Sequence, residues 1–234
     1  KAVKKFDLFI PVSKSINEFY KEYLTGPQCV YLPLCIDKVD HEDAKFDTNQ
    51  VTVMGRLSSE KAYDDMLRVF VKVLEQNPSA HLNIVGDGEE RHNLSVLADR
   101  LGIADSVTFY GNKVGKEKSQ ILENTSVFVT TSHYESFGLV LLEAMDYGIP
   151  CLSFDSAKGS LDIIEDGKDG YIIKNRDLDQ MANKLVELLN NPSKELSKNA
   201  KDKANSYSYE NVRKQWLDAF KNMNIHDLKT RVMF

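Results

Sequence analysis

The sequence has no long apolar run, few cysteines and no large excess of charge of either sign. No apolar stretch approaches the ~20 residues that a membrane-spanning helix needs. The net charge of −5 gives no basic face for nucleic acid, so no nucleic-acid partner is expected. The three cysteines are odd in number and lack the spacing of metal ligands, which indicates reduced thiols in a cytosolic protein.

Other signals are missing as well. There are no internal repeats, no low-complexity tracts, no cluster of metal-ligating residues and no Ser/His/Asp arrangement. No signal peptide is visible, but the chain starts at Lys1 in what resembles mid-domain sequence, so we expect that an upstream segment is missing. The length of 234 residues fits one large domain or one and a half small ones.

From Val51 onward, short apolar segments alternate with helical patterns. The apolar segments are near-continuous, as expected for parallel strands that helices cover on both faces. They are Val51–Gly55, His81–Gly86, Ser106–Tyr110, Ser126–Thr131, Ile149–Phe154 and Gly170–Lys174. The helices between them are predicted at Tyr63–Gln76, Glu89–Leu101, Lys116–Asn124 and Gly138–Tyr147. This alternation predicts an α/β fold with a doubly wound parallel, Rossmann-like sheet that binds ligands at the carboxyl ends of its strands.

Both ends of the chain depart from this alternation. The first residues predict a strand at Phe6–Val12, a helix at Ser13–Leu24 and a strand at Gln28–Leu34. Residues 38–50 are charged and show no periodicity, so they are predicted to be a linker. Helices are predicted near the other end at Leu178–Asn190, Ser193–Ser206 and Tyr209–Asn222.

The segment from Thr131 to Pro150 contains the most informative candidate functional residues. A predicted strand ends there, a polar loop with Glu135 follows, and a helix opens at Gly138 and carries Glu143, eight residues after Glu135. The first turn of a helix presents free N–H groups and a positive dipole end, which suit a phosphate. Carboxylates beside it suit sugar hydroxyls. The pattern indicates a nucleotide-sugar site, although glutamates at this spacing are also common on solvated helix surfaces.

Two cations, Arg56 and Lys61, follow the first strand of the alternation. Cations at such a place stabilise a departing diphosphate, because negative charge grows on it in the transition state. The alternative is a solvated pair at the start of a helix. Both candidate segments follow the carboxyl end of a strand, and in the common strand order these two strands are neighbours at the point where the order reverses.

Three motifs in this order resemble the signature of retaining glycosyltransferases of family 4. They are Glu135-x7-Glu143 around Phe137-Gly138-Leu139, Gly55-Arg56-Leu57 with Lys61, and Ile84-Val85-Gly86-Asp87-Gly88-Glu89. The resemblance runs from about Val3 to Phe220. It implies a GT-B fold, of which this chain would be the C-terminal donor-binding domain with a remnant of the N-terminal domain.

The resemblance implies a role for each residue of the site. Arg56, Lys61 and Glu135 would be catalytic, with the cations on the phosphates and Glu135 on the transferred sugar, and Glu143 would hold the ribose. The other donor-binding positions would be Gly55, Lys113, Val114, Ser136, Phe137, Gly138, Leu139 and Val140. Enzymes of this type use cations and a helix dipole in place of a metal, so neither a metal nor a cofactor is expected.

The resemblance also implies a division of the chain and a pathway. Residues 1–37 would be the end of an N-terminal acceptor domain whose remainder is missing, and residues 38–50 would be a linker. Residues 51–206 would form the nucleotide-sugar-binding domain, and residues 207–234 would form a C-terminal helix that crosses back to the N-terminal domain. The full enzyme would transfer a sugar, with UDP guessed as its carrier, to a glycan or lipid-linked acceptor in surface polysaccharide synthesis. We expect a cytoplasmic protein with peripheral association at the inner face of the membrane.

Some positions depart from the family pattern. Leu34 stands where the family has asparagine, Ser136 where it often has glycine, and Asp162 where it has glutamate, which leaves the transferred sugar open. His133 is favoured as a loop residue over a catalytic base, and Gly86-Asp87-Gly88 as a structural turn over a ligand contact. Two other functions remain open, namely a non-catalytic glycosyltransferase-like partner subunit, or a UDP-sugar epimerase or glycogen-type synthase on the same fold.

Overall fold

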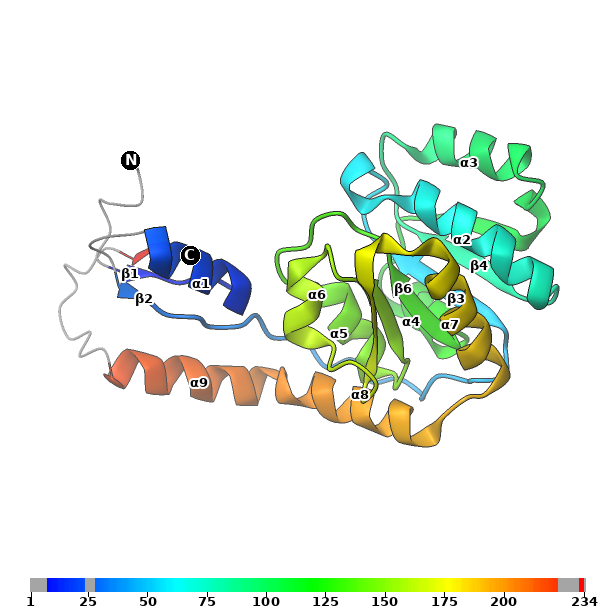
Figure 1. Ribbon diagram of the computed structural model, residues 1–234. Coiled ribbons are helices and arrows are strands. Elements are labelled where there is room, and N and C mark those ends of the chain that lie inside the picture. Colours follow the sequence, from blue (N-terminus) through cyan, green and yellow to red (C-terminus); the bar gives the residue numbers. More distant parts are fainter. Residues whose placement is uncertain (1–7, 24–27, 223–231, 234) are drawn as a thin grey trace.

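The computed structural model describes residues 8–23, 28–222 and 232–233, which form two sheets of different size. In Figure 1 the larger sheet and its helices lie on the right, and the smaller sheet with helix α1 lies on the left. Helix α9 runs along the bottom from one part to the other. The chain therefore has a six-stranded α/β unit and a second, much smaller packing unit beside it.

The larger sheet has six strands, in the order β5-β4-β3-β6-β7-β8, and every neighbouring pair is parallel. The strands are β3 (Gln50–Met54), β4 (His81–Val85), β5 (Val107–Gly111), β6 (Val127–Thr130), β7 (Cys151–Phe154) and β8 (Gly170–Ile173). Each lies within one residue or two of its predicted bounds. The order reverses between β3 and β6, where Val51 lies opposite Val127. The predicted doubly wound parallel sheet is thus confirmed, including the two strands at its switch point.

Helices connect successive strands of this sheet, and two further helices follow its last strand, β8. They are α2 (Tyr63–Gln76), α3 (Arg91–Arg100), α4 (Gly115–Glu123), α5 (Leu139–Asp146), α6 (Lys158–Ile163), α7 (Leu178–Asn190) and α8 (Lys194–Ser206). The short helix α6 was not predicted, because its six residues are too few to show a helical period. A large core fills the space between the sheet and α2 and α7, built around fully buried Phe70, Leu82 and Leu185.

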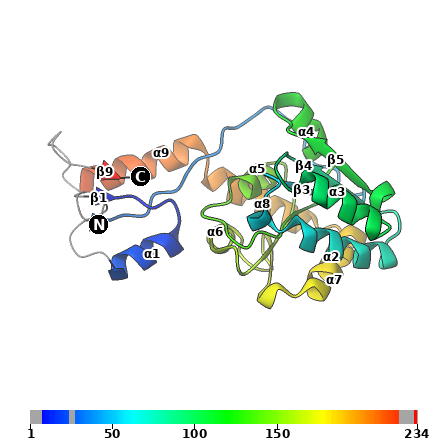
Figure 2. The ribbon, with the colours of Figure 1, turned by 90° about the horizontal axis from the view of Figure 1, so that it is seen from above.

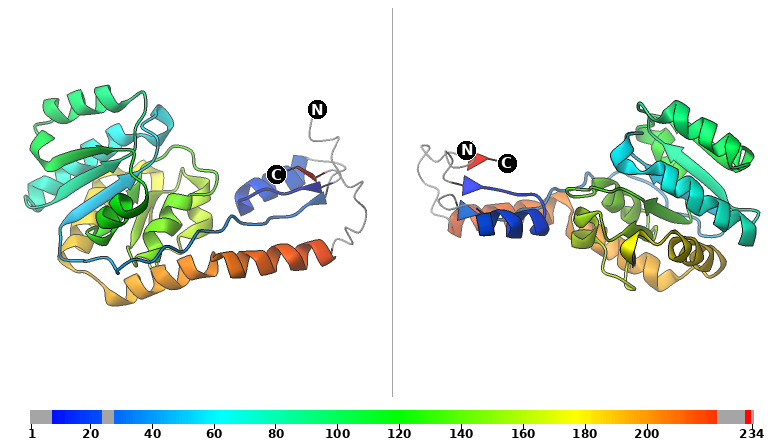
Figure 3. Two further views of the ribbon diagram at one scale, coloured as in Figure 1. Left: turned by 180° about the vertical axis from the view of Figure 1, so that it is seen from behind. Right: turned by 45° about the horizontal axis from the view of Figure 1, so that its top comes forward.

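The other face of the sheet is not apolar along β3, β4 and β5. Val51 and Val53 of β3 point into the core, but the alternate residues Gln50 and Thr52 lie on the opposite face together with Asn83. In the view from behind, α2 lies on the far side of these strands (Figure 3, left). The expectation of strands that are apolar on both faces is therefore wrong for this half, because only α4 crosses to that side before the order reverses.

The smaller sheet consists of β1 (Leu8–Phe9), β2 (Gln28–Cys29) and β9 (Val232–Met233), all parallel, with α1 (Lys14–Tyr23) beside it. The expected strands Phe6–Val12 and Gln28–Leu34 are longer than those observed, and Phe6, Asp7 and Leu24 lie outside the described residues. Pairing continues past β1 and β2 through Val30 N–H to the Phe9 carbonyl and Leu32 N–H to the Pro11 carbonyl. A regular ladder stops because proline has no N–H to donate.

Helix α9 (Tyr209–Asn222) joins the two parts. Trp216 packs against the cluster of Leu8, Ile10 and Leu32, and its indole N–H donates to the Pro33 carbonyl at 3.1 Å. The chain passes between the parts at two places, Ile36 and Ser208, and these residues pair with each other. Figure 2 shows α9 beside the extended segment that precedes β3. Within the described ranges, no helix is both long and apolar enough to cross a membrane.

Candidate functional site

The two candidate segments meet because β3 and β6 are neighbours. The loop after β3 is held by the turn after β4, where Leu57 N–H donates to the Asp87 carbonyl at 3.0 Å and Glu90 N–H donates to the Leu57 carbonyl at 2.9 Å. A Cβ on Gly88 would lie 2.4 Å from the Leu57 carbonyl oxygen, so only glycine allows this contact. The Gly86–Gly88 turn therefore packs against the loop that carries the predicted cations.

Lys61 and Glu135 form an ion pair at the centre of the site. The Lys61 Nζ lies 2.7 Å from the Glu135 Oε2, with side chains 22% and 15% exposed. Two further bonds fix the approach of their segments: the Thr131 hydroxyl donates to the Lys61 carbonyl at 3.0 Å, and His133 N–H donates to the Glu60 carbonyl at 2.8 Å. His133 therefore holds the loop through its backbone, while its side chain is exposed.

The loop of Glu135 rests on residues from α6. Gly159 N–H donates to the Glu135 carbonyl at 2.8 Å, and a Cβ on Gly159 would lie 2.6 Å from the backbone nitrogen of Phe137. The Phe137 ring is 3% exposed and packs edge-on against Tyr207. Glycine at position 159 and a buried ring at position 137 thus place the glutamate loop in close contact with α6.

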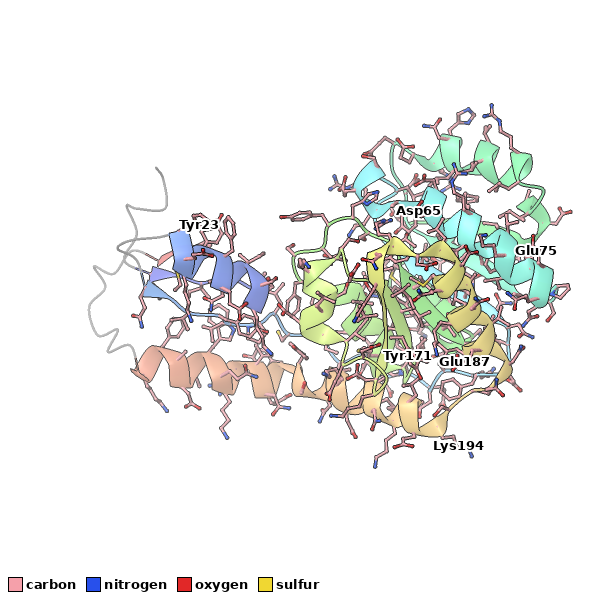
Figure 4. The ribbon with its side chains drawn as sticks, in the orientation of Figure 1. Tyr23, Asp65, Glu75, Tyr171, Glu187 and Lys194 are labelled. Carbon is pink, nitrogen blue, oxygen red and sulfur yellow. The ribbon has the colours of Figure 1, made fainter. Side chains whose placement is uncertain are left out.

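Arg176 connects the loop that carries Glu135 to helix α2. Its guanidinium pairs with Asp65, labelled in Figure 4, and donates to the carbonyls of Thr131 at 3.0 Å and Ser132 at 3.3 Å. It also donates to the Ser156 hydroxyl at 2.9 Å. This role of Arg176 was not predicted, because the segments that it joins are far apart along the chain.

Helix α5 presents an open N-terminus to the site. Gly138 precedes it with φ of 96°, a left-handed conformation that favours glycine, and no side chain caps the helix. Within the described residues, the N–H groups of Gly138, Leu139 and Val140 have no hydrogen-bond acceptor. Ser136 beside them is exposed. Free N–H groups and the positive end of the helix dipole make this a place that an anion can occupy.

Glu143 lies further along α5, and about one third of its side chain is exposed. Its carboxylate forms an ion pair with Lys118 of α4. The Lys118 Nζ lies 3.3 Å from its Oε1. Lys118 was not singled out from the sequence, where it is one of several lysines in a charged helix. The pair brings α4 and α5 together beside the open helix N-terminus.

The remaining predicted residues are near these groups in the topology but are not joined to them by a contact. The Arg56 side chain is exposed and makes no hydrogen bond or ion pair with the rest of the described chain, whereas its backbone carbonyl accepts from Ser58 N–H at 3.0 Å. Lys113 pairs with Glu117 at 2.6 Å, and Val114 is 78% exposed just before α4. Gly55 has φ of 150° at the end of β3. These residues are therefore not part of the Lys61–Glu135 contact.

Glu135 also affects a buried neighbour and borders a cleft. Burial, and then the charge of Glu135, raise the pKa of Tyr63 well above its usual range, so its hydroxyl stays protonated.

On the outer side, Glu135 and Tyr134 line a cleft of 540 Å³ with Phe9, Ile10 and Phe19 of the smaller unit. No group of three or more His, Cys, Asp or Glu side chains suited to a metal occurs in the described part of the chain.

Comparison with known proteins finds one family over most of the chain. Residues 37–206 match the family described as glycosyl transferases group 1. An uncharacterized glycosyltransferase of Haemophilus influenzae is 31% identical over 175 residues, which are 74% of this chain and 49% of that protein. The poly(ribitol-phosphate) alpha-N-acetylglucosaminyltransferase of Staphylococcus aureus is 28% identical over 187 residues, which are 78% of this chain and 38% of that protein. The chain spans half or less of the length of these relatives.

A solved structure shows the same fold. A variant of S. aureus TarM, in complex with fondaparinux, alpha-GlcNAc-glycerol and UDP, superposes with a TM-score of 0.83 at 24% identity, over 92% of this chain and 44% of the other. At this identity the likeness concerns the fold, and it confirms the predicted α/β class of GT-B type with a Rossmann-like domain.

Proposed function

Because this chain belongs to the glycosyl transferases group 1 family, we propose that it is the donor-binding half of a retaining glycosyltransferase of family 4. It would bind a nucleoside-diphosphate sugar, with UDP as the nucleotide, and transfer a hexose-type sugar to a glycan or lipid-linked acceptor. UDP bound in the TarM complex and the polyol-phosphate polymer named for the S. aureus relative support this choice of nucleotide and a surface polymer as product.

The observation that carries this proposal is the Lys61–Glu135 pair beside the open N-terminus of α5. The site offers a cation, a carboxylate and free N–H groups close together. A nucleotide-sugar has a charged diphosphate, which the cation and the N–H groups can bind, and neutral hydroxyls, which a carboxylate can bind. The diphosphate would take the N–H groups of Gly138 to Val140, and the sugar hydroxyls would donate to Glu135. Glu143 would accept from the ribose hydroxyls while Lys118 holds its carboxylate in place.

In the proposed reaction the bond between the anomeric carbon and the β-phosphate oxygen breaks, and its electron pair stays on the phosphate. Lys61 and Arg56 stabilise that charge more in the transition state than in the bound substrate, which is what lowers the barrier. The acceptor oxygen forms the new bond to the anomeric carbon and loses its proton to the leaving phosphate. Retention of configuration means that the acceptor approaches from the side that the diphosphate leaves.

The proposal includes the surroundings of the reaction. An acceptor domain would complete the cleft that Glu135 and Tyr134 line, since the smaller unit already forms one of its walls. The full enzyme would act in the cytoplasm, with peripheral association at the inner face of the membrane where lipid-linked acceptors lie.

Calorimetric titration of this chain with UDP and with GDP, in the presence of EDTA, tests the donor site. We expect UDP to bind without a metal and the Glu143→Ala variant to lose most of that affinity, because the ribose hydroxyls lose their acceptor. Glu187→Ala, an exposed glutamate on α7, is the matched control and should bind as the parent does. If GDP binds and UDP does not, the donor nucleotide is GDP. If Glu143→Ala binds UDP as tightly as the parent does, the proposed ribose contact is excluded.

A further inference from the structure

Helix α6 lies between the glutamate loop and the smaller unit. Its first turn contacts the loop, because Gly159 N–H donates to the Glu135 carbonyl at 2.8 Å. Its last turn contacts helix α1, because Lys14 N–H donates to the Asp162 Oδ2 at 2.6 Å. Figures 1 and 2 both show α6 at the edge of the larger unit that faces α1. A helix of six residues therefore joins the proposed donor site to α1.

Asp162 of the larger unit caps a helix of the smaller unit. The first turn of a helix has free N–H groups and a positive dipole end, which a carboxylate stabilises. In α1 the Ser13 hydroxyl accepts from Ile16 N–H at 3.2 Å, whereas Lys14 N–H finds its acceptor in α6. Burial raises the pKa of Asp162, and hydrogen bonds from Lys14 and Ser15 N–H lower it in part. The carboxylate of Asp162 therefore completes the N-terminus of α1.

The position of α1 relative to the donor site depends on this contact. Within the described residues, no hydrogen bond or ion pair other than those of Asp162 joins α1 to the larger unit. The attachment through α9 reaches the strands of the smaller unit, since Trp216 packs on Leu8, Ile10 and Leu32. Helix α1 in turn forms a wall of the cleft that Glu135 lines, with Phe19 among its lining residues.

We propose that Asp162 is a positioning residue that transmits the state of the donor site to α1. Phosphate on the N–H groups of α5 would fix the glutamate loop, the loop would fix α6 through Gly159, and Asp162 would fix the N-terminus of α1. The cleft wall opposite Glu135 is then held in place once the donor is bound, which favours binding of the donor before the acceptor. The nucleotide step rests on the proposed function, whereas the link from the loop through α6 to α1 does not.

Hydrogen exchange followed by mass spectrometry, with and without UDP at a concentration that saturates the parent, tests the nucleotide step. In the parent we expect UDP to slow exchange in the glutamate loop and α5, and also in α1, which lies outside the donor site. In Asp162→Ala without UDP, α1 should exchange roughly 2- to 30-fold faster, the range that loss of a helix cap gives. UDP should then still protect α5 but no longer α1.

Two further variants separate the role of the cap from a general effect on α6. Asp162→Asn keeps an oxygen that accepts from the N–H groups of α1, so UDP should again slow exchange in α1. Leu161→Ala changes an exposed neighbour on the same helix and is the matched control, which should respond to UDP as the parent does. Protection of α1 by UDP in Asp162→Ala equal to that in the parent would overturn the proposal. Protection of α5 without protection of α1 in the parent would overturn it as well.

A second arm of the experiment needs no nucleotide. Gly159→Ala displaces α6 against the glutamate loop, so it should speed exchange in α1. Combined with Asp162→Ala it should add nothing further in α1, because the link is already broken, and additive effects would contradict the link. If UDP protects no part of the parent, the proposed donor site fails, and this arm decides on Asp162 by itself.

Discussion

Lys61 faces two anions in the proposed reaction, Glu135 in the resting site and the diphosphate of the donor. An ammonium group has three donors, so it can keep the 2.7 Å contact with Glu135 while a second donor meets a phosphate oxygen. The ion pair therefore places the cation before the substrate arrives. The charge is already oriented when the leaving group departs, which is the condition under which such groups lower a barrier most.

Replacing Lys61 by Ala in the full-length enzyme should lower kcat by about 10²–10³-fold, the effect typical of removing one preorganised charge-stabilising group. Steady-state transfer assays measure this. Lys61→Arg keeps the charge and should retain part of the activity, whereas Lys194→Ala, an exposed lysine on α8 labelled in Figure 4, should have no effect. Unchanged turnover in Lys61→Ala would falsify the role of the cation.

His81 lies on the open face of the sheet and predicts a dependence of stability on pH. Burial lowers its pKa below the usual value of 6.5, and its Nε2 lies 2.8 Å from the Thr108 hydroxyl. In the window between the lowered pKa and 6.5, the unfolded chain binds a proton that the folded chain does not. Stability should therefore fall as the pH is lowered through that window. Urea unfolding between pH 7.5 and 5 should show a shallower fall for His81→Gln than for the parent, and parallel curves would refute the assignment.

At the level of elements, the position of the glutamate loop depends on close packing against α6. Gly159 is not in a left-handed conformation, so alanine there adds no backbone strain, but its Cβ would meet the backbone of Phe137 at 2.6 Å. Either the loop or α6 must move. Because Glu135 is in that loop, a displacement changes the contact with Lys61 as well.

We predict that Gly159→Ala lowers the free energy of unfolding by about 1–3 kcal/mol, as overpacking of a close contact does, and weakens UDP binding. Thermal or urea denaturation and calorimetry measure the two effects. The adjacent variant Ser160→Ala is the control, because the buried Ser160 hydroxyl has no hydrogen-bond partner within the described chain and little is lost with it. If Gly159→Ala matches Ser160→Ala in both measurements, the loop is not held by this contact.

Across the whole molecule, the smaller unit is attached through α9 and the paired crossings at Ile36 and Ser208. Trp216 supplies a ring and an N–H to this attachment, whereas Leu217 on the same helix is 41% exposed. The larger unit has its own core between the sheet and α2 and α7. The two units should therefore respond differently to a change in α9.

Trp216→Ala should increase amide hydrogen exchange in β1 and α1 and leave exchange in β3 and α2 unchanged, because only the smaller unit loses packing. Leu217→Ala is the matched control and should leave both units as in the parent. Hydrogen exchange followed by mass spectrometry separates the two. A uniform increase across both units would mean that they unfold as one.

Much of the fold was predictable from local pattern. Helix α2 was predicted with its observed bounds, because its apolar residues repeat at helical spacing and the chain breaks the pattern at both ends. The six strands of the larger sheet were predicted because each is a short apolar run between helices. Helix α6 was missed because it is too short to show a period, and the small strands were overestimated because proline interrupts their pairing.

The sequence by itself determined the order of strands and helices along the chain, the presence of two cations after one strand, and a pair of glutamates in the loop and helix after another, since these depend on residue type and local spacing. Only the tertiary structure decided that Lys61 meets Glu135, that Lys118 meets Glu143, and that Arg176 and Gly159 support the glutamate loop. These contacts join segments far apart along the chain, and their geometry is set by the packing of β3 against β6 and of α6 against the loop. Local pattern carries no information about such distances.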